Sequence, residues 1–172
     1  YGLGKNLSII KSTTGIISLV ASLLLIWILH KKRAVDFPSP TTGCRLLLGM
    51  SICDVLFSLS HVTFGAVVPR ELSYAVWNAH GNFATCQAFG FMNVLGMFAG
   101  LFYNCTLNLY YLAVISFQKS DDYIKRRLEP WLHNAVPMSF GLAVSIVFLV
   151  IEGINASNDG DCTIAFTYEP PH

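Results

Sequence analysis

Residues 85–117 carry no charged side chain, and this stretch limits what the chain can fold into. A helix rises 1.5 Å per residue and needs about 20 apolar residues to cross a bilayer, so the stretch is long enough to span one. Small and polar residues recur in it at steps of three or four, which places them on one helix face. These residues are Asn93, Gly96, Met97, Gly100, Asn104, Asn108 and Tyr111. Because amides are costly against lipid and a G-x-x-x-G pair admits a neighbouring helix, we expect this face to look into a helix bundle.

The composition agrees with a chain embedded in a membrane. Hydrophobic residues make up 53% of the sequence and charged residues 12%, with a mean hydropathy of +0.54. A chain this apolar is not expected to fold as one soluble core. The formal net charge of +1 argues against a nucleic-acid partner. Because the sequence starts at Tyr1 without an initiator methionine and stops shortly after Pro170-Pro171, we expect it to be a piece of a longer protein.

Four apolar runs predict an all-α fold, a single polytopic membrane domain of four transmembrane helices. The helices are expected at about residues 7–30, 44–68, 85–117 and 131–152, followed by a polar outer tail at 153–172. Pro137 lies one turn into the fourth run, where it can kink a membrane helix without breaking it.

Basic residues fall mostly on one side of this predicted topology. One side holds Lys31, Lys32, Arg33, Arg45, Lys119, Lys125, Arg126 and Arg127, and the other holds Lys5, Lys11 and Arg70. Cytoplasmic connections carry an excess of Lys and Arg, so we expect the amino terminus to lie outside the cell, at the plasma membrane. The triplet Asn155-Ala156-Ser157 then provides an N-glycosylation site on the outer side.

The cysteines divide between the two sides of the predicted membrane. Cys86 and Cys162 lie on the outer, oxidising side, whereas Cys44, Cys53 and Cys105 lie in the cytoplasmic half or within the bilayer. We therefore predict a disulfide between Cys86 and Cys162, and the alternative is two free thiols. The disulfide would hold the tail after the fourth helix over the start of the third.

Asp54 is the one acid deep within an apolar run. Counted from the cytoplasmic ends of the helices, it lies about level with residues 100–104 of the third run. A carboxylate in hydrocarbon costs several kcal/mol unless it is paired, so we expect Asp54 to face Asn104, or a water or ion held there. The pair would serve either as a structural hydrogen bond or as a switch that responds to a proton or an ion.

Four side chains in the outer halves of the helices are candidate ligand contacts around an outward-facing cavity, although ordinary bundle packing would also explain each of them. They are His61, Asn93, Met97 and Glu152. A catalytic or metal site of Asp54, Ser58 and His61 is not expected, because Asp54 and His61 are roughly 10 Å apart along a helix, with no second His or Cys cluster nearby. We therefore expect no enzyme activity, no cofactor and no metal.

Several of these features together resemble the first four helices of a G-protein-coupled receptor. They are Asp54 midway in the second helix within ICDVLFSLS, Cys86 at the start of the third, Tyr111-Leu112-Ala113-Val114 near its cytoplasmic end, and Cys162 after the fourth. Asn134-Ala135-Val136-Pro137 and Gly160-Asp161-Cys162-Thr163-Ile164 are most similar to the cyclic-AMP-receptor-like and secretin-like branches. The rhodopsin-like branch has an acid and an arginine where this chain has Leu109-Tyr110.

The resemblance implies a receptor that senses an extracellular ligand and signals to a heterotrimeric G protein, with three further helices after His172. It also implies that Tyr111, Lys125, Arg126 and Arg127 face the G protein. From the sequence alone, the basic cluster 125–127 is explained first by membrane orientation and contact with lipid, and the alternative is contact with a cytosolic partner. The alternative is a complete four-helix structural or channel-forming membrane protein.

Overall fold

The computed structural model describes residues 2–35, 41–63, 65–72, 78–127, 136–156 and 162–164. Most of these residues are helical. The elements are α1 (Gly2–Val35), α2 (Thr42–Val62), the 3-10 helix η1 (Arg70–Leu72), α3 (Phe83–Ile115), α4 (Asp121–Arg127), α5 (Val136–Val150), β1 (Ile154–Ala156) and β2 (Cys162–Ile164).

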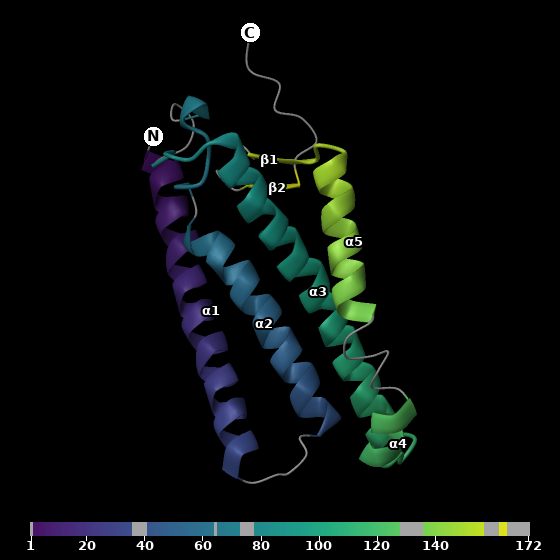
Figure 1. Cartoon of the computed structure of the whole chain (residues 1–172). Helices are drawn as coiled ribbons and strands as arrows, with labels where there is room; N and C mark the ends of the chain where they lie inside the picture. The colour runs from purple at the N-terminus through teal and green to yellow at the C-terminus, as the bar shows by residue number, and fades with distance from the viewer. Residues whose placement is uncertain are drawn as a thin grey trace.

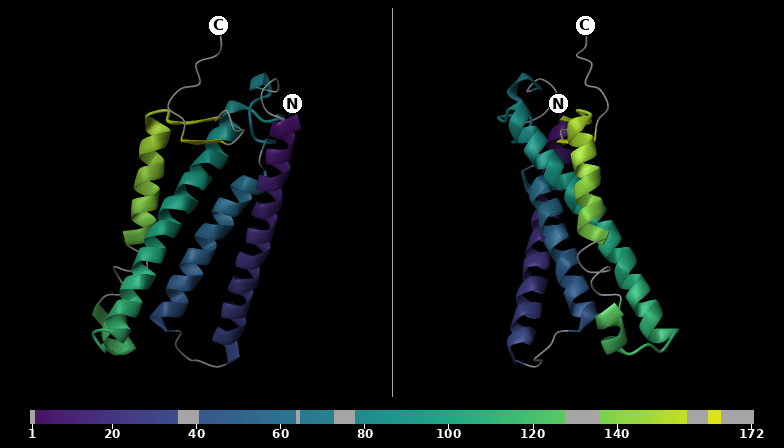
Figure 2. Two further views of the ribbon diagram at one scale, coloured as in Figure 1. Left: turned by 180° about the vertical axis from the view of Figure 1, so that it is seen from behind. Right: turned by 45° about the vertical axis from the view of Figure 1, so that its right-hand side comes forward.

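The helices α1, α2, α3 and α5 are arranged in a row (Figure 1). α2 packs between α1 and α3, and α3 packs between α2 and α5. The start of α1, the start of α3, the end of α5 and the two strands lie at one end, which we call the disulfide end. The end of α1, the start of α2 and α4 lie at the other, which we call the α4 end (Figure 2).

Burial in this row differs from that in a water-soluble bundle, although a few large apolar side chains such as Leu46 and Val94 are buried. The buried polar residues are small, apart from one amide: Ser22, Thr42, Ser51, Ser58, Ser60, Asn93, Thr106 and Ser145. Large apolar side chains point outward instead, with Trp27 60% and Val150 75% exposed. Lipid tails are as apolar as leucine, so large apolar residues can face them while small residues let the helices approach. The pattern indicates a protein that lies in a bilayer.

Three helices of the described residues are long and apolar enough to cross a membrane. Their apolar parts are Ile9–Lys31, Thr42–Val62 and Phe83–Ile115, which confirms the first three predicted spans. The fourth predicted run, 131–152, appears as the shorter apolar helix α5, of 15 residues. That length covers about 22 Å of a hydrocarbon core of about 30 Å, and residues 131–135 lie outside the described part of the chain.

A glycine lies at each of the three helix contacts in the row. A Cβ at Gly15 of α1 would lie 3.1 Å from the His61 Cβ of α2, and one at Gly96 of α3 would lie 2.8 Å from the Cys53 carbonyl oxygen of α2. A Cβ at Gly141 of α5 would lie 2.8 Å from the Ala99 Cβ of α3. The predicted role of Gly96 in close packing is confirmed, whereas a Cβ at Gly100 would make only an ordinary 3.6 Å contact with Cys53.

The second helix ends earlier than the sequence predicts. The run 44–68 was expected to be helical throughout, but α2 ends at Val62. The Thr63 hydroxyl and amide both donate to the Leu59 carbonyl, at 3.0 and 3.2 Å, and Gly65 has a φ of 78° that turns the chain. The residues after this turn are still apolar, and Val68 is buried at the disulfide end. A prediction from hydropathy alone therefore places the end of the helix too late.

Part of the predicted polar tail forms a small sheet. β1 and β2 pair antiparallel, with Ile154 opposite Ile164 and Ala156 opposite Cys162. The pair packs on the start of α3, where Ile154 lies against Gly90. Among the described residues, β1 and β2 are the only strands longer than an isolated bridge, and they lie across the disulfide end (Figure 1).

Candidate functional site

Asp54 and Asn104 line the same cavity, between α2 and α3. The cavity has a volume of about 350 Å³. Its lining residues are Met50, Asp54, Phe57, Gly96, Met97, Phe98, Gly100, Leu101 and Asn104. Gly96 lets α2 approach closely at this cavity, whereas a Cβ at Gly100 would make only an ordinary contact with Cys53. The structure thus brings Asp54 to the level of residues 100–104, as the sequence predicts.

The polar atoms of this cavity are suited to holding a proton, a cation or water. Asn108 donates its Nδ2 to the Asn104 carbonyl at 2.9 Å and to Asn104 Oδ1 at 3.3 Å. Because Oδ1 accepts that bond, the Asn104 amide N–H groups can donate into the cavity. None of the described residues that line the cavity is basic, so its lining supplies no cation to neutralise Asp54. A carboxylate at mid-membrane depth needs such compensation.

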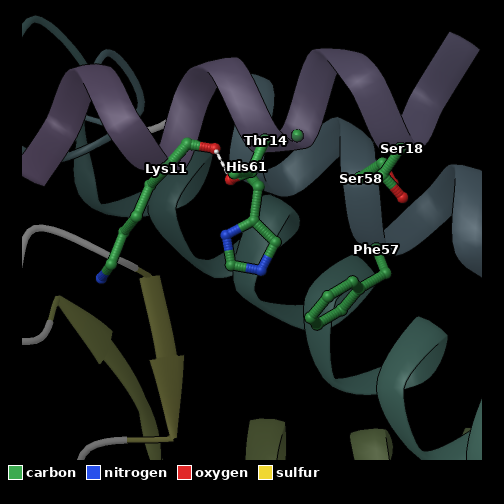
Figure 3. Close-up of a pocket in the computed structure, with 7 residues that line it drawn as sticks. Lys11, Thr14, Ser18, Phe57, Ser58 and His61 are labelled. Atoms are coloured by element: carbon green, nitrogen blue, oxygen red, sulfur yellow. Dashed lines mark hydrogen bonds between the residues drawn. The ribbon is translucent and has the colours of Figure 1, made fainter.

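A second pocket of about 250 Å³ lies between α1 and α2, nearer the disulfide end (Figure 3). Its lining residues are Lys11, Thr14, Gly15, Ser18, Phe57, Ser58 and His61. Phe57 lines both cavities, so the two are neighbours along α2. Its ring meets the His61 ring edge-on, with centroids 4.5 Å apart.

The four candidate ligand residues do not surround one cavity. Met97 lines the α2–α3 cavity and His61 lines the α1–α2 pocket. Asn93 is buried and donates its Nδ2 to the Ser60 hydroxyl at 2.9 Å, which is a helix-packing contact. Glu152 follows α5 with a φ of 53°, and its carbonyl accepts the Asn155 amide at 2.7 Å.

The predicted disulfide between Cys86 and Cys162 is present, with a Cα–Cα distance of 5.2 Å. It joins the first turn of α3 to β2 within a buried cluster that includes Val68, Ala79 and Ala156. The other cysteines, Cys44, Cys53 and Cys105, are free thiols. The disulfide therefore fixes the hairpin over the disulfide end of α3.

The predicted partner contacts lie at the α4 end. Tyr111 is 45% exposed near the end of α3. Lys125, Arg126 and Arg127 form the last turn of α4, with both arginines exposed. The predicted glycosylation residue Asn155 lies at the disulfide end, in β1 opposite Thr163.

Sequence reasoning did not single out Tyr110, which connects three segments at the α4 end. Its hydroxyl donates to Asp121 Oδ1 of α4 at 3.2 Å. Its ring packs on Gly43 of α2, where a Cβ would lie 2.9 Å from the ring. Tyr110 and Tyr111 are adjacent in the sequence but point in different directions from α3. One ring is therefore packed and the other is exposed.

Replacing Tyr110 with phenylalanine should lower the stability of the α4 end. The ring packing on Gly43 is retained, but the hydrogen bond to the Asp121 carboxylate is lost, at a cost of about 1 kcal/mol. The melting temperature of the purified protein should fall by about 3 °C. Tyr111→Phe is the matched control and should leave it unchanged, whereas equal shifts for both variants would contradict the role of the Asp121 contact.

Within the described residues, no three His, Cys, Asp or Glu side chains come close enough together to hold a metal ion. Asp54 and His61, considered together in the sequence, line different cavities. Asp54 and His61 lie apart because they are seven positions apart on α2, which is roughly two turns of helix.

Three membrane-length helices, outward apolar side chains and buried small residues define a multi-pass helical membrane protein. No family model, curated protein or solved structure matches the chain.

Proposed function

We propose that this chain is the amino-terminal, membrane-spanning part of a G-protein-coupled receptor. It senses an extracellular ligand and signals to a heterotrimeric G protein across the plasma membrane. The resemblance in sequence supplies the class of protein. The observation that carries the proposal is the cavity shared by Asp54 and Asn104.

The cavity gives the bundle a group whose state can differ between two packings. Asp54 and Asn104 belong to different helices, and a carboxylate in this environment is stable only with a proton, a cation or added hydrogen-bond donors. A ligand shifts a conformational equilibrium when it interacts differently with the two states. In our proposal the Asp54 cavity contributes that difference and couples movement at the disulfide end to movement at the α4 end.

The distribution of charge supports an orientation with the α4 end in the cytoplasm. Arg45, Lys119 and the cluster 125–127 lie at the α4 end, whereas Lys11 and Arg70 lie toward the disulfide end. An excess of basic residues is typical of cytoplasmic connections, and disulfides persist on the oxidising side. Tyr111 and the basic last turn of α4 would then face the G protein, and Asn155 would face the sugar-transfer machinery.

The test is nucleotide exchange on a purified heterotrimeric G protein, driven by the full-length protein in lipid nanodiscs. Asp54→Asn should lower basal exchange about fivefold or more, because a neutral amide cannot change its charge between the two packings. The same variant should melt at a higher temperature, since it removes a charge that is costly within the membrane.

Glu71→Gln is the matched control, because Glu71 is exposed in η1, away from the α4 end, and lies outside the cavity. This variant leaves the charge within the membrane unchanged. Its melting temperature and its exchange rate should therefore both stay close to those of the original protein. A full-length protein that promotes no exchange would overturn the receptor proposal. Normal exchange by Asp54→Asn would instead remove the proposed role of the cavity.

A further inference from the structure

Of the tyrosines that the structure describes, Tyr123 is the one accessible to a soluble enzyme. Tyr103 is buried, and the Tyr110 hydroxyl already donates to Asp121. Tyr111 is exposed but belongs to the membrane-length apolar helix α3. Tyr123 lies outside the spans, on α4, and is 48% exposed. Within the part of the chain that the structure describes, its hydroxyl makes no hydrogen bond. We propose that Tyr123 is a phosphorylation site for a cytoplasmic tyrosine kinase.

The reaction is the transfer of the terminal phosphoryl group of ATP. The Tyr123 hydroxyl oxygen bonds to the terminal phosphorus, and the bond from that phosphorus to the bridging oxygen breaks. ADP leaves with the electron pair, and the phenolic proton passes to the catalytic base of the kinase. This chain supplies only an unpaired hydroxyl outside the membrane. The proposal rests on the cytoplasmic orientation of the α4 end in the proposed function, and not on coupling to a G protein.

Two acids precede Tyr123 directly in the sequence. Asp121 accepts the Tyr110 hydroxyl at 3.2 Å. Asp122 is exposed, and among the described residues its carboxylate has no partner. Complementary charges contribute to the specificity of an encounter between two proteins and speed their association. A free carboxylate next to the acceptor hydroxyl therefore favours a kinase whose substrate groove is basic.

The helix that carries Tyr123 is suited to local opening. A kinase holds the segment around its tyrosine in an extended form, so α4 has to unwind. α4 has 7 residues, which is too few for a stable helix on its own. It lies beside the end of α3 (Figure 1), where the Ile124 side chain is buried and Asp121 accepts the Tyr110 hydroxyl. A segment with so few contacts opens at a low cost in free energy, and the Tyr110 bond limits how often it does so.

Basic side chains beside Tyr123 fit the phosphate once it is attached. The Lys119 ammonium lies 5.3 Å from the centroid of the Tyr123 ring. Arg126 and Arg127 follow three and four positions after Tyr123, which places them on the same side of α4, and both are exposed. A phosphotyrosine carries roughly two negative charges and forms charge-assisted hydrogen bonds with such groups. The modification would therefore lower the positive charge of the α4 end.

The test adds a purified soluble tyrosine kinase that prefers acidic residues before tyrosine, with Mg²⁺ and ATP, to the full-length protein in lipid nanodiscs. Both faces of a nanodisc are accessible, so this result depends neither on orientation nor on a G protein. Mass spectrometry of proteolytic peptides should locate the phosphate on Tyr123. Tyr123→Phe should lose that signal and keep the melting temperature of the original protein. Asp122→Asn should slow phosphorylation about tenfold, whereas Glu71→Gln, which removes a distant acid, should not change it.

Tyr110→Phe tests the opening of α4. Loss of one hydrogen bond to Asp121 should raise the population of the open segment, and with it the rate of phosphorylation, about fivefold. Tyr111→Phe is its matched control and should keep the original rate.

The proposal is overturned if the kinase leaves Tyr123 unmodified or modifies Tyr111 in preference. An unchanged rate in Tyr110→Phe would overturn the role of the α4 opening. Protein isolated from cells whose phosphatases are inhibited should also carry the phosphate on Tyr123. If Tyr123 were modified in nanodiscs but never in cells, the cytoplasmic orientation of the α4 end would be contradicted, and the proposal would be overturned with it.

Discussion

Replacing Cys86 with alanine should lower the free energy of unfolding by about 4 kcal/mol, the largest effect expected for any single substitution in this chain. The disulfide joins residues separated by 76 positions, so in the reduced chain the loop that contains α3, α4 and α5 gains conformational freedom when it unfolds. In the folded state the change also removes the covalent hold on the hairpin, whose β1 residue Ile154 packs at Gly90. The measurement is denaturation of the purified protein under oxidising conditions.

The same variant should reduce signalling of the full-length protein at the cell surface. The hairpin lies across the disulfide end, where an extracellular ligand would enter in our proposal, and it would no longer be fixed to α3. Cys105→Ala is the matched control, since Cys105 is an exposed free thiol on the same helix. If Cys86→Ala and Cys105→Ala were equally stable, the disulfide would contribute nothing, and unchanged signalling would count against the receptor proposal.

The positions that the sequence predicted correctly follow from counting residues along each helix and from the order in which the chain crosses the membrane. The level of Asp54 relative to Asn104 needs only the helix rise and the two predicted helix ends, and both residues line one cavity. The Cys86–Cys162 disulfide needs only the topology, because two cysteines share one side. Neither prediction requires knowledge of how neighbouring helices are rotated.

The residues that the sequence placed wrongly depend on how neighbouring helices are rotated. Asn93 and Met97 are one turn apart, yet Asn93 is buried against Ser60 while Met97 is 43% exposed. A period of 3.6 residues assigns a face to each side chain, but it does not say which neighbour fills that face. The β1–β2 hairpin was missed for a related reason: strands of three residues carry little local signal and are held by Cys86 and the start of α3.

Replacing Gly96 with alanine should destabilise the contact between α2 and α3 by about 1–3 kcal/mol. The added methyl group would lie 2.8 Å from both the Cys53 carbonyl oxygen and the Phe57 nitrogen. Both are backbone atoms of α2, so the clash cannot be relieved by rotating a side chain, and the helices must separate. The loss outweighs the gain of up to about 1 kcal/mol that alanine normally brings to a helix in place of glycine.

Gly100→Ala is the matched control on the same helix, one turn further on. A Cβ there would lie 3.6 Å from the Cys53 Cβ, an ordinary contact, so this variant should be as stable as the original protein or more stable by up to about 1 kcal/mol. Opposite shifts in melting temperature for the two alanines are therefore expected. Because Gly96 and Phe57 both line the Asp54 cavity, the Gly96 variant should also change nucleotide exchange, provided that the full-length protein couples to a G protein. If the two variants were equally stable, α2 and α3 would be farther apart than in the structure. The cavity between them would then differ in shape from the one described above.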